Sequence, residues 1–203
     1  TFCGTNPSHR TSTAQRPATL HLTSRLITVL GVNYLHKNRI FALQVLQQLI
    51  SQSFDCHLVL AGATPKFGSA SEAEQEFLAV HPELINHVTI LDALSEEEKR
   101  WLVSHSSLIL YPSLAEGFGL VPFEAARLGT PTLSSRLTSL DEILPLDIPT
   151  VVDFDVDRTA EQIVHILSDS AIGTSIVEEL VKRGNLFTWQ RAAREFFSLI
   201  DEV

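Results

Sequence analysis

"SLILYPSLAEGFGLVPFEAARLGTPTLSS", residues 107–135, places two apolar runs on either side of a glycine-containing turn and a short helical pattern. The first run, 107–113, is continuous rather than alternating, which is typical of a strand buried on both faces. Apolar positions at helical spacing then predict a helix over 120–128, which Gly129 ends. A second strand is predicted over 130–135. A strand, a helix and a strand in this order predict a parallel pair.

The same alternation of strand and helix continues in both directions along the chain. Further strands are predicted over 25–31, 56–63, 87–93 and 148–154. Further helices are predicted over 38–52, 71–81, 95–106, 158–169, 173–185 and 187–203. Short apolar strands between amphipathic helices predict an α/β fold, a Rossmann-like parallel sheet of about six strands with helices on both faces.

Local signals refine these expectations. Ser71 is expected to cap the helix over 71–81, and Ser95 with Glu98 has the spacing of a capping box. Residues 1–24 lack periodicity and are rich in Thr, Ser and Pro, so we interpret them as a linker or an N-terminal arm. Residues 25–203 then form one domain, and its amphipathic closing helix is expected to lie against another surface.

Composition excludes several classes of function. The chain has 203 residues, 44% of them hydrophobic, and a formal charge of −9. This charge argues against nucleic acid or an anionic membrane surface as partner, although a local basic pocket could still bind an anion. Two cysteines, Cys3 and Cys56, are too few for a disulfide framework, and Cys56 is expected to be a buried thiol. This cysteine content fits a protein of the reducing cytosol. No apolar stretch approaches the 18 residues typical of a transmembrane helix. The sequence starts at Thr1 and contains no Met, which predicts a domain cut from a longer protein.

Common nucleotide and metal motifs are missing. The sequence has no G-x-G-x-x-G after its first strand, no G-x-x-x-x-G-K-[ST], no H-E-x-x-H and no EF-hand spacing. The eight histidines are scattered without ligand spacing, so no metal site is predicted.

Glu116 and Glu124 stand on either side of the turn before the helix over 120–128. In open parallel sheets ligands bind beyond the carboxyl ends of the strands, and this turn is predicted to lie there. Gly117 and Gly119 would let the backbone approach a ligand and adopt positive φ, and the helix start suits a phosphate. Two carboxylates around a phosphate seat suit a ligand with an anionic centre and hydroxyls at both ends, such as a nucleoside diphosphate sugar. The alternative is that Glu124 only complements the helix dipole and Glu116 is a solvated loop acid.

The stretch "EGFGLVPFEAARLGTP" (116–131) resembles the E-x7-E signature of retaining glycosyltransferases of family 4, which have the GT-B fold. "VLGVNYLHKN" (29–38) is similar to the first strand and phosphate loop of their C-terminal, donor-binding domain. The segments "ILDALSEEEKRWLVSHSSLILYPS" (90–113), "SSRLTSLDEIL" (134–144) and "FTWQRAAREFF" (187–197) extend the likeness, which covers 25–203.

The resemblance implies a role for each matching residue. Glu124 would hold the ribose hydroxyls, and Glu116 would contact the donor sugar beside the reacting carbon. Lys37 would pair with the diphosphate and neutralise the departing nucleotide, so Glu116 and Lys37 are the expected catalytic residues. The backbone of the turn would bind the sugar and the diphosphate, through Gly117, Phe118, Gly119 and Leu120. The segment from Leu91 to Leu94, after the third strand, would flank the base through its main chain.

The chain departs from the family pattern beside the phosphate loop. Val32 and His36 stand where the family usually has polar or basic residues. One positive charge is therefore missing unless His36 or Arg39 substitutes for it, and we expect His36 to contact the donor.

The resemblance implies transfer of a sugar from a nucleoside diphosphate sugar (UDP-, GDP- or another) to a glycan or lipid-linked acceptor, with retention and without a required cofactor or metal. The acceptor would bind an N-terminal domain absent from this sequence, so the domain alone would bind nucleotide without transferring a sugar. The expected process is polysaccharide biosynthesis in the cytoplasm. The full-length protein would then be peripheral to the inner face of a membrane.

Two alternatives remain open at this point. One is a non-catalytic interaction or nucleotide-binding module with a degraded donor site, which Val32 favours. The other is a sugar-nucleotide epimerase of the same fold, which would need additional acid–base residues from another domain.

Overall fold

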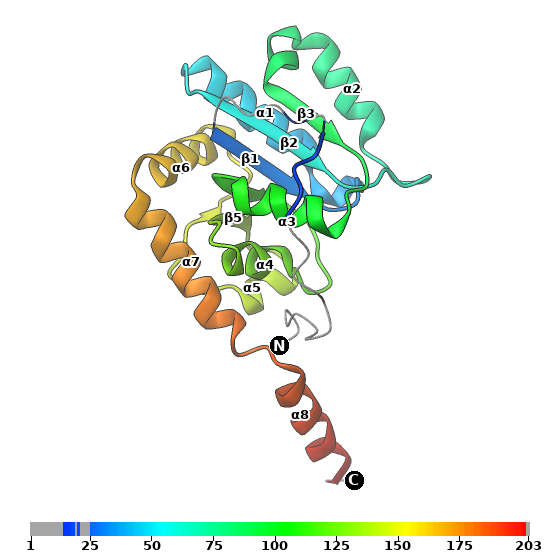
Figure 1. Ribbon diagram of the computed structural model, residues 1–203, viewed down its shortest axis with the longest axis vertical. Helices are drawn as coiled ribbons and strands as arrows, with labels where there is room; N and C mark the ends of the chain where they lie inside the picture. The colour runs from blue at the N-terminus through cyan, green and yellow to red at the C-terminus, as the bar shows by residue number, and fades with distance from the viewer. Residues whose placement is uncertain (1–13, 19, 21–24, 202–203) are drawn as a thin grey trace.

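The computed structural model describes residues 14–18, 20 and 25–201. A six-stranded parallel sheet in the order β3-β2-β1-β4-β5-β6 forms its centre (Figure 1). The strands are β1 (Arg25–Leu30), β2 (Cys56–Ala61), β3 (Val88–Leu91), β4 (Leu108–Tyr111), β5 (Thr132–Ser135) and β6 (Thr150–Val151). This arrangement confirms the predicted Rossmann-like α/β class and the number of strands.

Helices connect the strands and cover the sheet. The α-helices are α1 (Arg39–Ser51), α2 (Ser71–Val80), α3 (Glu96–His105), α4 (Val121–Arg127), α5 (Ser139–Ile143), α6 (Val156–Ser168), α7 (Ser170–Gly184) and α8 (Trp189–Asp201), with short 3-10 helices η1 (Leu35–Lys37) and η2 (Pro82–His87). Helices α1 and α6 pack together over one face, whereas α3 covers the opposite face (Figure 1). The prediction of helices on both faces is therefore confirmed.

The core divides between the two faces of the sheet because successive strand residues point to opposite sides. Ile27 and Val29 of β1 join the larger cluster, with residues of α1, α6 and α7. Leu26 and Leu30 join the smaller cluster, with Leu102 of α3. A central strand that is apolar on both sides explains why its sequence is a continuous apolar run.

Several predicted boundaries differ from the structure. The strand predicted over 148–154 is only Thr150–Val151, because Asp153 and Phe154 adopt positive φ (52° and 50°), which a strand does not allow. Ser71 is the first residue of α2 rather than its cap, and Ala70 occupies the N-cap without a side-chain hydrogen bond. The capping box of Ser95 and Glu98 is confirmed, since each side chain bonds the other residue's amide.

Part of the predicted arm packs on the domain. Pro17 and Leu20 are buried, and the Arg16 guanidinium lies 5.8 Å from the centre of the Trp101 ring on α3. The Gln15 amide also donates to the carbonyl of Glu97 (3.3 Å). The remainder of the prediction for 1–24, and Cys3, lie outside the described residues.

Cys56 begins β2 as a buried thiol, as predicted. Burial raises its pKa to about 12, with a smaller contribution from the Asp55 carboxylate. At neutral pH this thiol is protonated, so it acts as a small apolar core residue rather than a nucleophile.

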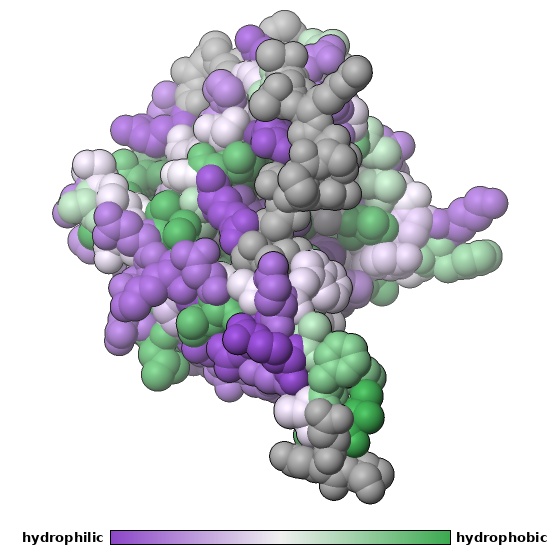
Figure 2. Space-filling model, turned by 60° about the horizontal axis from the view of Figure 1, so that its bottom comes forward, coloured by the Kyte–Doolittle hydropathy of each residue, from purple (hydrophilic) through white to green (hydrophobic). Residues whose placement is uncertain are grey.

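The helix α8 projects from the end of the domain (Figure 1), and Figure 2 shows hydrophobic residues gathered along one side of it. Trp189, Phe196, Phe197 and Leu199 are each more than 60% exposed. The expected amphipathic helix is present, and its apolar side faces solvent. Across the described residues, no helix has both the length and the apolar character needed to cross a membrane.

Candidate donor site at the carboxyl ends of β1 and β4

The order of the sheet makes the boundary between β1 and β4 the point at which the connections between strands change direction. The chain runs outward from β1 to β3, and α3 on the opposite face then returns it to β4, directly beside β1. Loops that follow two such neighbouring strands diverge to opposite faces, which is where ligands bind in open α/β sheets. The two loops also touch, because the amide of Leu114 donates to the carbonyl of His36 (2.7 Å).

Lys37 and Glu116 meet at this position. Lys37 lies in η1 after β1, Glu116 lies in the turn after β4, and 2.6 Å separates Lys37 Nζ from Glu116 Oε1. The Lys37 ammonium also donates to the hydroxyl of Tyr111 (3.3 Å), the last residue of β4. The side chains of Lys37 and Glu116 are only 12% and 11% exposed, so water screens this ion pair weakly. Both are predicted site residues, but their ion pair was not predicted from the sequence.

The environment of Glu116 favours its charged form. Burial alone would raise the pKa of this carboxyl, but hydrogen bonds from polar groups around it, Lys37 first, outweigh burial and hold the pKa below its ordinary value. Burial and the nearby Glu116 carboxylate raise the pKa of Tyr111. At neutral pH the site therefore holds the Glu116 carboxylate and the Tyr111 phenol hydroxyl in one hydrogen-bonded group with Lys37.

The backbone of Gly31 makes room for the lysine. Gly31 follows β1 at φ 128°, and a Cβ atom there would lie 3.0 Å from Lys37 Cε. A side chain at position 31 would thus push the lysine stem and strain the backbone.

The turn that carries Glu116 is held by the start of α5. The hydroxyl of Ser139 donates to the carbonyls of Glu116 (2.9 Å) and Phe118 (3.0 Å), and the Glu116 amide donates to Thr138 Oγ1 (3.0 Å). The Phe118 ring packs edge-on against Phe187 (5.4 Å between centroids). The hydrogen bonds place the turn against the start of α5, and the ring contact places it against the segment between α7 and α8. The sequence pattern predicted neither neighbour.

The two glycines of the turn differ from each other. Gly119 adopts φ 87°, as predicted, but Gly117 has no positive φ, so that part of the expectation is wrong. A Cβ at Gly119 would lie 2.4 Å from Leu140 Cδ2, whereas nothing lies within 4 Å of one at Gly117. Because Gly117 keeps an ordinary φ, other residues are sterically possible there.

We therefore expect Gly119→Ala to lower the free energy of unfolding by about 1–2 kcal/mol, because alanine resists a left-handed backbone and meets the buried Leu140. Gly117→Ala is the matched control, two residues away in the same turn, and should change stability by no more than about 0.5 kcal/mol. Urea denaturation of both variants measures the difference. Equal stabilities would contradict the conformation assigned to the turn.

Glu124 lies in the first turn of α4, and Lys99 of α3 approaches it. Lys99 Nζ is 3.6 Å from Glu124 Oε2 and 3.6 Å from Glu96 Oε2. The side chains of Lys99 and Glu124 are each 38% exposed, so a ligand can reach the carboxylate. The Glu124 carboxylate therefore has a counter-ion, Lys99, that sequence reasoning missed, since nothing in the spacing along the chain joins α3 to α4.

Comparison with known proteins places the chain in a family. The family model described as glycosyl transferases group 1 matches residues 12–184. The chain belongs to the glycosyl transferases group 1 family.

Relatives of this group 1 domain are sugar transferases. It is 23% identical over 180 residues to the gpi3 subunit of phosphatidylinositol N-acetylglucosaminyltransferase from Schizosaccharomyces pombe, covering 87% of this chain and 38% of the relative. It is 31% identical over 100 residues to the serotype-specific mannosyltransferase WbdA of Escherichia coli, covering 49% of this chain and 12% of WbdA. The chain thus spans well under half the length of these relatives.

Solved structures share its fold. Anabaena HepE in complex with UDP and glucose superposes with a TM-score of 0.73 at 16% identity, over 89% of this chain and 49% of HepE. The C-terminal domain of the glycosyl transferase group 1 protein LpcC from Francisella tularensis superposes with a TM-score of 0.67 at 17% identity, over 80% of this chain and 85% of that domain. These neighbours confirm that the group 1 domain has the Rossmann-like architecture of GT-B transferases.

The remaining residues that the sequence analysis discussed differ in how far they are exposed to solvent. His36 is exposed and stacks on Tyr34 (5.5 Å between centroids), and Val32 is 39% exposed beside the loop. Leu91 is buried at the end of β3, and its carbonyl accepts a hydrogen bond from the Gly62 amide (3.0 Å), while Leu94 is half-buried.

Arg39 cannot replace the missing phosphate contact. It is 1% exposed, and its Nη2 donates to the carbonyl of Gly31 (2.8 Å). That alternative in the sequence analysis is wrong, because the guanidinium points into the protein and not toward a ligand.

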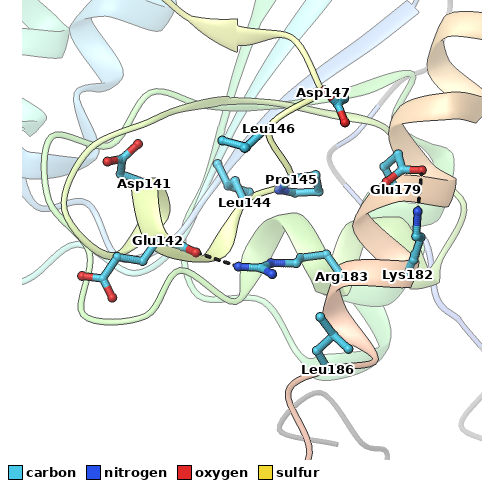
Figure 3. Close-up of a pocket in the computed structure, with 10 residues that line it drawn as sticks. All are labelled: Asp141, Glu142, Leu144, Pro145, Leu146, Asp147, Glu179, Lys182, Arg183 and Leu186. Atoms are coloured by element: carbon cyan, nitrogen blue, oxygen red, sulfur yellow. Dashed lines mark hydrogen bonds and ion pairs between the residues drawn. The ribbon is translucent and has the colours of Figure 1, made fainter.

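A pocket lined by α5 and α7 lies away from these residues. Figure 3 shows the residues that line it, which come from α5, the connection after it and α7. The volume of this cavity is about 480 Å³. Arg183 bridges this region by donating to the carbonyls of Glu142 (2.8 Å) and Ile143 (2.9 Å). None of its lining residues is one predicted to hold the donor. Among the described residues, no group of three or more His, Cys, Asp or Glu side chains could hold a metal ion.

Proposed function

We propose that this chain is the donor-binding domain of a retaining glycosyltransferase of the family 4 type. In the full-length protein it transfers a sugar from a nucleoside diphosphate sugar to an acceptor such as a glycan or a lipid-linked sugar. The observation that carries the proposal is the ion pair of Lys37 and Glu116, 2.6 Å long, at the point where β1 and β4 meet. A cation for a diphosphate and an acceptor for sugar hydroxyls stand together at the position where the fold binds ligands.

The relatives support this reading. HepE was solved with UDP and with UDP-glucose, and WbdA is named as a mannosyltransferase. The E-x7-E pattern of Glu116 and Glu124 agrees with the same chemistry.

The proposed roles follow from the contacts. A lysine ammonium has three protons, and in the described structure Glu116 and Tyr111 accept two of them, which leaves one for a diphosphate oxygen. Glu116, ionised at neutral pH, accepts hydrogen bonds from the donor sugar, and Glu124 accepts them from the ribose. The backbone of 117–120 contributes to sugar and diphosphate binding, and 91–94 flanks the base.

The reaction has a simple balance of bonds. The bond between the anomeric carbon and the diphosphate oxygen breaks, and its electron pair stays with the diphosphate. The acceptor hydroxyl oxygen forms a new bond to the same face of that carbon, and its proton passes to the departing phosphate oxygen. Lys37 stabilises the charge that develops on the diphosphate in the transition state, which is where electrostatic stabilisation is most effective.

The acceptor would bind a second domain, as in other GT-B enzymes. The domain alone then binds nucleotide, and transfer belongs to the full-length transferase, which we place in the cytoplasm and, through its second domain, at the inner face of a membrane. The exposed apolar side of α8 agrees with a chain that packs against further protein.

The direct test is binding of UDP, GDP and ADP by isothermal titration calorimetry and thermal shift. We expect at least one of them to bind below about 1 mM, which corresponds to roughly −4 kcal/mol, and to raise the Tm. If none of the three binds at millimolar concentration, the donor-binding proposal is wrong.

The second candidate, a module with a degraded donor site, is favoured by one observation. Val32, 39% exposed, follows Gly31 where a basic side chain would reach a diphosphate.

Val32→Arg separates the two candidates. If Lys37 already serves the diphosphate, we expect the variant to change the nucleotide Kd by less than about threefold, the size of an exposed charge contact. Leu35→Arg adds the same charge at another exposed apolar position in this loop and is the matched control. A gain of tenfold or more for Val32→Arg alone would favour the degraded module.

A further inference from the structure

A buried ion pair lies behind the loop that carries Lys37. Arg39, the first residue of α1, and Glu74 of α2 are each 1% exposed, and 3.8 Å separates Arg39 Nη1 from Glu74 Oε1. Asn33, also 1% exposed, donates from Nδ2 to Glu74 Oε2 (3.2 Å) and to Ser71 Oγ (2.9 Å). The burial of Glu74 was not predicted from the sequence.

This pair is not an efficient source of stability. Burial lowers the pKa of Arg39 and raises the pKa of Glu74, so each charged form is costly where it lies, and mutual attraction only partly offsets the cost. Within the described structure, Arg39 Nε and Nη1, Glu74 Oε1 and Asn33 Oδ1 are buried without a hydrogen-bond partner. Buried ion pairs of this kind are often replaceable by apolar residues without loss of stability. Their contribution is better sought in the geometry that they impose.

The ion pair is connected to the loop over 31–38 by hydrogen bonds. Arg39, which directly follows the loop, donates from Nη2 to the carbonyl of Gly31, the first residue of the loop (2.8 Å). In its middle the Asn33 amide donates to Ala63 O (2.9 Å) and its carbonyl accepts from the Ala70 amide (3.3 Å). The pair therefore links the beginning of the loop, through Gly31, with its middle, through Asn33.

Lys37 depends on both ends of this loop. Its stem passes over Gly31, where a Cβ would come within 3.0 Å of Cε, and its ammonium reaches across to Glu116. A shift of Gly31 or an opening of the loop would move the lysine stem and lengthen the 2.6 Å contact.

We propose that Arg39 and Glu74 are positioning residues that hold the loop over 31–38 closed, so that the Lys37 ammonium faces Glu116 and the donor diphosphate. This inference rests on the proposed function. Neither residue touches the donor: Arg39 acts through the carbonyl of Gly31, and Glu74 acts through Arg39 and Asn33. The second strand–helix unit, which carries Glu74, thereby contributes to donor binding without lining the site.

The test replaces both charges by apolar side chains in Arg39→Met/Glu74→Met. We expect the Tm to stay within a few degrees of the unmodified domain or to rise, while the affinity for UDP falls at least tenfold. Hydrogen exchange followed by mass spectrometry should show faster exchange in 31–38 and unchanged exchange in 42–49 of α1. Glu74→Gln keeps an oxygen for Asn33 and removes the charge, so it should lose less affinity than the double variant.

The matched control is Thr28→Val/Ser106→Ala, which removes another buried polar pair (Thr28 Oγ1 to Ser106 Oγ, 2.7 Å) away from the loop. It should leave UDP affinity unchanged even if the Tm falls. Unchanged affinity in the double methionine variant would overturn the positioning role, and so would a loss of affinity that only follows a fall in Tm. If the unmodified domain binds no nucleotide, the proposed function fails, and the exchange rates alone then judge whether the pair holds the loop.

Discussion

Lys37→Met is expected to lower the affinity of the domain for UDP by about 10- to 100-fold, because a hydrogen bond between charged groups contributes roughly 1.5–3 kcal/mol. Methionine keeps most of the length of the lysine stem over Gly31, so the change removes the charge with little loss of packing. Calorimetry of UDP and of uridine measures the effect. Uridine has no diphosphate, so its weaker binding should be the same in both proteins.

The matched control is Lys182→Met, a lysine in α7 whose side chain is 77% exposed. It removes the same charge from the net balance but should leave the Kd for UDP unchanged. If Lys37→Met weakens UDP and uridine equally, the lysine acts on the fold of the site and not on the diphosphate. If it weakens neither, the role assigned to Lys37 is wrong.

The second large effect concerns the ribose. We expect the unmodified domain to bind UDP at least tenfold more tightly than 2′,3′-dideoxy-UDP, since each hydrogen bond from a hydroxyl to a carboxylate contributes roughly 1.5 kcal/mol or more. Glu124→Ala should bring UDP to the affinity of the dideoxy nucleotide and leave the latter nearly unchanged. Competition calorimetry with both nucleotides measures all four affinities, which form a thermodynamic cycle.

Glu96→Ala is the control for this second experiment, because Glu96 is the other carboxylate beside Lys99 and its side chain is 82% exposed. It should keep the preference for UDP. A Glu124→Ala domain that still distinguishes the two nucleotides would show that another group binds the ribose, and Glu124 would then only complement the start of α4.

The sequence predicted those features that depend on local pattern. Continuous apolar runs gave the strands, helical spacing gave the helices, and the spacing of Ser95 and Glu98 gave a capping box that the structure contains. Glu116 and Lys37 were named from a motif, and the structure brings them to 2.6 Å although 79 positions separate them.

What the sequence did not predict depends on contacts between distant segments. Glu74 is buried because it lies on the side of α2 that faces Arg39. The one sequence signal of this burial is its place at helical spacing from Phe77 and Leu78, on the apolar side of the helix. Lys99 meets Glu124 only through the packing of α3 beside α4. The strand over 148–154 was overestimated because the apolar pattern carries no sign of the positive φ at Asp153.

A crystal structure of the domain with UDP would locate the bound nucleotide. We expect a diphosphate oxygen within about 3 Å of Lys37 Nζ and ribose hydroxyls at a similar distance from the Glu124 carboxylate. A nucleotide bound in another part of the molecule, such as the cavity between α5 and α7, with Lys37 still engaged only by Glu116 and Tyr111, would contradict this expectation.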